Sequence, residues 1–239
     1  MAASSASPKR LLIVILCMAL MIMMGQKIQA LDLEVTNNDQ GSDGGKRFDA
    51  EIGKSGAMEM LDSASKFVWD TFRQQSPADR KNVQKISLIV ESMPDKPSIV
   101  AYTIGEEIHL KSESMAGTQG DIKTGIRGVL YHEVTHVWQW FGNGNAPSGL
   151  TEGIADYVRL TAGLVDPNWV KPGGGDRWDE GYAVTAYFLQ YCESVSSGFV
   201  ANMNAKLAGG WDVGFFKDLT GKSVDELWND YKAKYASPA

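Results

Sequence analysis

The segment from residue 121 to 141 constrains the fold of this 239-residue chain more than any other part. Apolar residues dominate the segment and polar positions are few, so we expect a long helix at the centre of the fold. Two of the chain's three histidines lie inside this segment, in the five residues His132-Glu133-Val134-Thr135-His136. Buried histidines need hydrogen-bond partners or a ligand, so the elements around this helix must supply one or the other.

The spacing of the two histidines favours a metal ligand. Residues four apart on a helix differ by about 40° in azimuth and about 6 Å in height. His132 and His136 can therefore each point one imidazole nitrogen at the same tetrahedral Zn²⁺. Glu133 lies about 100° around the helix from His132, where it does not bind the metal but reaches a water bound to it. A metal lowers the pKa of that water and a carboxylate accepts its proton, so we predict a zinc site with Glu133 as general base.

A catalytic zinc also needs a third protein ligand and one open coordination position. No histidine follows His136, and the best source of a third ligand is the acidic pair farther along the chain. Glu152 and Asp156 lie four apart on a predicted helix over residues 150–162 and share one face of it. We assign Glu152 to the metal and Asp156 to the N–H of a ligating histidine, where it fixes the tautomer of the ring. The reverse assignment is the main alternative.

These two blocks of sequence carry a family resemblance. His132-Glu133-Val134-Thr135-His136 followed by Glu152-Gly153-Ile154-Ala155-Asp156-Tyr157 resembles the gluzincin group of zinc peptidases, in which a downstream Glu, often followed by Gly, is the third ligand. Most of residues 31–235 further resembles the plant basic secretory protein family, also described as pathogenesis-related class seventeen. This resemblance implies a secreted, defence-related zinc metallopeptidase that acts on a peptide or protein substrate. The alternative is a catalytically silent defence protein that keeps zinc as a structural clip and binds a microbial or cell-wall ligand.

Peptide hydrolysis also requires a hydrogen-bond donor for the developing oxyanion. We select Tyr182, because its position between a loop and a helix can bring the phenol over the metal; Arg177 and His109 are the alternatives. Residues 98–103 and 107–110 are predicted to form two strands of a hairpin about Gly105, and the second strand precedes the metal helix. In the zincin arrangement an edge strand at this place holds the peptide backbone by β-augmentation.

The N-terminus has the parts of a secretory signal peptide. Lys9 and Arg10 precede an apolar run over residues 11–24, and a short segment then ends in the small residue Ala30. The run has 14 residues, whereas about 20 are needed to span a bilayer. We therefore predict a cleaved leader over residues 1–30, a secreted protein of the cell wall or apoplast, and no membrane attachment after cleavage.

Residues 31–239 are predicted to form a single α+β domain of the zincin-like metallopeptidase type, with a small mixed or antiparallel sheet followed by a mostly helical half. The leader contains three basic residues and no acidic ones, so the chain without it has 20 basic and 29 acidic residues. This balance argues against nucleic-acid binding, which needs an excess of Lys and Arg. Cys192 is then the only cysteine, so stability must come from a core, a metal or a partner rather than from a disulfide.

Overall fold

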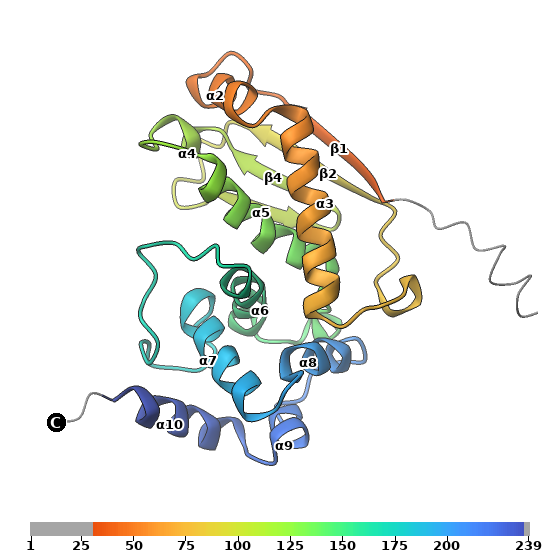
Figure 1. Cartoon of the computed structure of the whole chain (residues 1–239), viewed down its shortest axis with the longest axis vertical. Helices are drawn as coiled ribbons and strands as arrows, with labels where there is room; N and C mark the ends of the chain where they lie inside the picture. The colour runs from red at the N-terminus through yellow and green to blue at the C-terminus, as the bar shows by residue number, and fades with distance from the viewer. Residues whose placement is uncertain (1–30, 237–239) are drawn as a thin grey trace, which may run out of the picture. The chain divides into compact units, whose positions relative to one another are not determined.

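A small mixed sheet forms the N-terminal part of the structure, a computed structural model that describes residues 31–236 (Figure 1). The predicted leader, residues 1–30, lies outside the described residues. The strands are β1 (Asp32–Asn37), β2 (Lys85–Glu91), β3 (Ala101–Ile104) and β4 (Glu107–Lys111). In the spatial order β1-β2-β4-β3, the first three are parallel to one another and β3 is antiparallel to β4. The predicted α+β class is confirmed.

Two helices lie between the first two strands of the sheet. Strands β1 and β2 are joined through α2 (Asp43–Glu51) and α3 (Gly53–Thr71), so the sheet begins with a βαβ unit. Gly44 and Gly45 lie inside α2, although glycine is unfavourable in the interior of a helix. In the structure these glycines allow close packing. A Cβ on Gly44 would lie 1.9 Å from the backbone oxygen of Ser112, and a Cβ on Gly45 would lie 1.9 Å from the backbone oxygen of Asp39.

Helices α3 and α5 (Lys123–Trp138) lie side by side across one face of the sheet (Figure 1). The alternating residues Ile86, Leu88 and Val90 of β2 are fully buried in this layer. Helix α5 is buried over most of its length, as its apolar composition predicted. The indole of Trp138, at the end of α5, donates a hydrogen bond to Ser65 Oγ of α3 at 3.2 Å. The helix with the two histidines is therefore fixed against both the sheet and α3.

The C-terminal half is helical, as expected. Helix α6 packs against α5 and α7, and α7 in turn contacts α8 and α10. Phe188 of α7 is fully buried among aromatic rings of the last helices. Ser223 and Glu226 form a capping box at the start of the last helix, with both hydrogen bonds present. The bounds of the remaining elements are η1 (Pro77–Asp79), α4 (Glu113–Ala116), η2 (Gly142–Gly144), α6 (Ser148–Thr161), α7 (Tyr182–Val195), α8 (Phe199–Leu207), α9 (Phe215–Thr220) and α10 (Val224–Tyr235).

The edge strand next to the histidine helix is β3 and not the strand over residues 107–110. The hairpin itself was predicted, but β4 is hydrogen-bonded on both sides, to β2 and to β3. A strand with two neighbours cannot accept a third, so β-augmentation at this end of the sheet is possible only on β3.

Within residues 31–236, no helix combines the length and the apolar composition needed to cross a bilayer.

Candidate metal centre

Successive turns of α5 bring the two predicted imidazoles together. His132 Nε2 and His136 Nε2 lie 3.0 Å apart, and the rings meet edge to face at 85°. His132 is buried and His136 is nearly so. Because the helix is fixed on both sides, the two nitrogens point to one place on its cleft-facing side.

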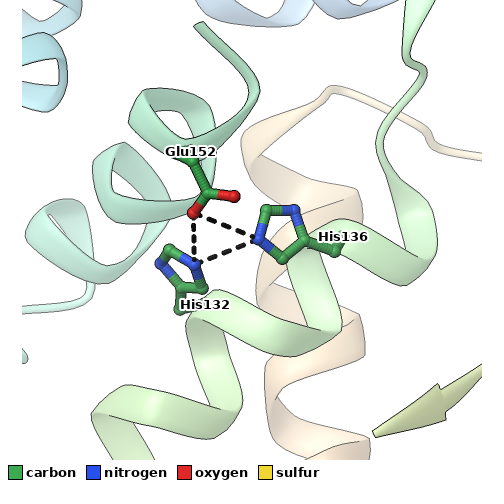
Figure 2. A group of neighbouring side chains, drawn as sticks. All are labelled: His132, His136 and Glu152. Atoms are coloured by element: carbon green, nitrogen blue, oxygen red, sulfur yellow. Dashed lines mark hydrogen bonds and ion pairs between the residues drawn. The ribbon is translucent and has the colours of Figure 1, made fainter. Parts of the chain in front are cut away.

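Helix α6 adds a carboxylate at the same place. Glu152 Oε2 lies 3.1 Å from His132 Nε2 and 3.6 Å from His136 Nε2 (Figure 2). These three side chains form a group whose ligand atoms all lie within 4.8 Å of one another. The residues proposed from the sequence as metal ligands are therefore adjacent in space, although they come from two helices.

The chemistry and spacing of these three donor atoms fit zinc. Two imidazole nitrogens and one carboxylate oxygen are typical ligands of a catalytic zinc. Ligands about 2.0–2.2 Å from a tetrahedral zinc lie roughly 3.3–3.6 Å from one another. The three measured separations, 3.0, 3.1 and 3.6 Å, are close to this range.

Asp156 lies behind His132, on the side away from the other imidazole. Its Oδ1 is 2.7 Å from His132 Nδ1, and the side chain is buried. A carboxylate at this position accepts the Nδ1–H and leaves the Nε2 lone pair free for a metal. Glu152 faces the two Nε2 atoms and Asp156 faces Nδ1, which is the arrangement that the sequence analysis assigned to the two carboxylates.

Two carboxylates make the site strongly attractive for a cation. Burial of the His132 ring lowers its pKa, but the hydrogen bonds to Asp156 and Glu152 outweigh burial and raise the pKa to about 10. Burial raises the pKa of Glu152, and the hydrogen bonds from His132 and His136 outweigh it and bring the pKa well below its usual range. A proton on His132 therefore competes with any metal for this site.

Glu133 is held from the edge of the sheet. Thr103 of β3 donates its hydroxyl to Glu133 Oε2 at 2.7 Å. The Thr103 hydroxyl oxygen also lies 3.2 Å from the backbone carbonyl oxygen of Glu133. Glu133 is buried, so its carboxylate has little freedom to reorient. The sequence analysis missed Thr103. The hairpin offered a way to identify it: Thr103 pairs with buried Ile108 and shares the inward face of the hairpin, where a hydroxyl needs a hydrogen-bond partner.

Gln139 is a second residue that the sequence analysis missed. It follows the last residue of α5 and is fully buried. Its side-chain Nε2 lies 2.8 Å from His136 Nδ1, on the side of the ring that faces away from Glu152. Each imidazole of the site therefore has its own polar neighbour behind it.

Tyr182 lies over the site in a strained backbone conformation. Its ring is nearly parallel to that of His132, with centroids 6.0 Å apart, and its φ is +45°, which non-glycine residues rarely adopt. The tight packing of α6 brings Tyr182 there: a Cβ on Gly149 would lie 1.8 Å from Asp179 O, and one on Gly153 would lie 2.3 Å from Thr185 Cγ2.

The two alternatives to Tyr182 are directed elsewhere. The Arg177 side chain is 71% exposed and pairs with Asp179 at 3.4 Å. His109 Nδ1 lies 2.7 Å from Glu91 Oε1, and neither Arg177 nor His109 lines the cleft at the metal centre. Tyr182 is thus the candidate donor that the fold brings to the site.

A cleft of about 990 Å³ runs past the three ligand atoms. Residues 98–103 at the edge of the sheet line the cleft, together with residues on one face of α5. Tyr182 and Trp169 line it as well. The strand edge, the candidate general base and the candidate metal ligands therefore open onto one continuous space.

Comparison with known proteins gives two matches. A sequence model of the family described as "Peptidase of plants and bacteria" matches residues 28–231. A protein of Boswellia serrata named "Basic secretory protease" is 43% identical to this chain over 58 residues, which are 24% of this chain and 66% of that protein. The chain thus spans just under two thirds of that relative's length. No solved structure matches the chain significantly.

Proposed function

The chain belongs to the basic secretory protein family, described as peptidases of plants and bacteria, and from the geometry of its site we propose that it is a zinc metallopeptidase with a zincin-like domain. The single observation that carries this proposal is the convergence of His132 Nε2, His136 Nε2 and Glu152 Oε2 at separations suited to zinc. A zinc ion held there lowers the pKa of water and polarises a carbonyl oxygen.

Glu133 is the general base of the proposed mechanism. It sits on the same helix as the two histidines, one residue after His132, and opens onto the cleft. Its carboxylate accepts a proton from the attacking water and can deliver it to the leaving amine. Thr103 holds this carboxylate in one orientation through its 2.7 Å hydrogen bond.

Tyr182 is the proposed donor to the oxyanion. Burial, together with the negative charges of Glu152, Asp156 and Glu133, raises the pKa of its hydroxyl, so the hydroxyl keeps its proton at neutral pH. Such a group can donate a hydrogen bond where negative charge develops. The peptide itself would lie along β3, which within residues 31–236 pairs only with β4 and so offers its outer edge to an extended backbone.

We extend the proposal to secretion and to a role in defence in the cell wall. The leader predicted over residues 1–30 and the name of the Boswellia serrata relative support secretion. The defence role rests on the resemblance to the pathogenesis-related class.

Replacing Glu133 with Gln tests the mechanism. The amide cannot accept a proton, so we expect peptide cleavage to fall by about 10²–10⁴-fold, while zinc content by elemental analysis stays at that of the unmodified protein. The matched control is Glu59→Gln, the same chemical change on an exposed position of α3. Full cleavage activity in Glu133→Gln would refute the assigned role. Bound zinc with no cleavage of any peptide in a diverse library would instead favour the catalytically silent zinc protein.

A further inference from the structure

The Gln139 amide has one polar atom without a partner. Its Nε2 lies 2.8 Å from His136 Nδ1, whereas its Oε1 is buried and has no hydrogen-bond partner within residues 31–236. Buried polar atoms are nearly always paired, and each exception needs an explanation. This exception lies directly behind a candidate metal ligand, so the orientation of the amide bears on the metal centre.

The side of the amide that faces the ring decides which nitrogen of His136 carries the proton. With Nε2 of Gln139 facing the ring, an N–H is donated to Nδ1, and the imidazole proton must sit on His136 Nε2. A protonated Nε2 has no lone pair for a metal, yet this is the atom that faces His132 and Glu152. Rotation of the amide by 180° places Oε1 on Nδ1, and Oε1 then accepts an N–H from the ring. The proton moves to Nδ1 and the Nε2 lone pair becomes free.

We propose that Gln139 is the positioning residue of His136: its amide oxygen accepts the Nδ1–H and so keeps Nε2 available for zinc. The inference rests on the proposed zinc site and adds to it a residue that acts through a ligand. It makes the two histidines equivalent, since Asp156 accepts the Nδ1–H of His132 in the same way. A neutral acceptor suits the second position, because Glu152 and Asp156 already balance the two charges of the metal.

The test compares zinc affinities, measured by competition with a chromophoric chelator, so no catalytic turnover is needed. Gln139→Met keeps the length of the side chain but has no hydrogen-bond acceptor, and we expect its zinc affinity to fall about 10–100-fold. Gln139→Glu keeps an acceptor, and its affinity should stay within a few-fold of the unmodified protein or exceed it. Gln74→Met is the matched control, since Gln74 is also buried with an unpartnered Oε1 but lies outside the metal centre, just past the end of α3. Its zinc affinity should not change.

A melting temperature measured in the presence of a chelator separates positioning from packing. Gln139→Met removes one buried hydrogen bond, the one between the amide and His136 Nδ1, so the melting temperature in chelator should fall by only a few degrees while the zinc affinity falls by the much larger factor given above. Equal zinc affinity in Gln139→Met and the unmodified protein would overturn the inference, as would an equal loss in Gln139→Glu or in Gln74→Met. If the unmodified protein binds no zinc, the proposed function fails as well; if it binds zinc and only these comparisons fail, the role of Gln139 alone is wrong.

Discussion

Replacing Thr103 with Val tests whether the edge strand controls the general base. The substitution removes the hydroxyl that reaches Glu133 Oε2 at 2.7 Å and keeps a β-branched side chain suited to a strand. A hydrogen bond to a charged group contributes about 1.5–3 kcal/mol. Because Thr103 is only half-buried, water can replace part of the lost contact, and we take the lower end, about 1.5 kcal/mol. Tenfold in rate corresponds to about 1.4 kcal/mol, so kcat should fall about tenfold.

The assay is steady-state cleavage of a fluorogenic peptide, with kcat and KM determined separately. The hydroxyl of Thr103 acts on the base, so kcat should carry the loss while KM and zinc affinity stay near those of the unmodified protein. Thr103→Ser keeps the hydroxyl and should restore most of the rate. Thr36→Val is the matched control, because Thr36 lies on an exposed position of β1, at the opposite edge of the sheet.

An unchanged kcat in Thr103→Val would refute the reasoning. So would a loss of the same size in Thr103→Ser, since the effect would then follow from strand packing rather than from the hydroxyl. A parallel fall in zinc affinity would show that the strand acts on the metal ligands and not on Glu133.

Two further outcomes follow from the structure of α5. Gly125 lines the cleft, and a Cβ built on it meets no atom within 4 Å. Gly125→Leu should therefore raise the free energy of unfolding by about 0.5–1 kcal/mol, because leucine has the higher helix propensity. It should also lower kcat/KM, because the longer side chain narrows the cleft, and an unchanged kcat/KM would contradict this. The raised pKa of His132, about 10, means that its proton must leave for zinc to bind. Zinc affinity in competition titrations should therefore rise with pH by up to about tenfold per unit between pH 7 and 9, and a flat profile would contradict the assignment.

The grouping of the candidate metal ligands was predictable because its spacing is local. His132 and His136 are one helical turn apart, and so are Glu152 and Asp156, so each pair shares a helix face in any fold that keeps both helices. The sequence could not measure how α6 would approach α5. That approach depends on Gly128 of α5, where a Cβ would lie 2.8 Å from Arg159 Nε of α6.

The sheet was less predictable, because its order depends on distant pairings. The hairpin of β3 and β4 is local, and the turn at Gly105 revealed it. Strand β2 comes from a separate segment of the chain. It pairs with β4 and thereby leaves β3 at the edge of the sheet. The same limit applies to the zincin-like type of domain, which stays a prediction since no solved structure matches the chain.

The two supporting residues differ in how visible they were. Thr103 reaches Glu133 from another element, thirty residues earlier in the chain, so only the tertiary fold could reveal the contact. Gln139 lies three residues after His136, a spacing that puts two side chains on the same side of a helix. It is also an uncharged polar residue within an otherwise apolar run over residues 137–141. A buried amide must find a partner, and the polar residues on that side of the helix are Thr135 and His136. The sequence therefore limited the partner of the Gln139 amide to two residues, and the structure shows that it is His136.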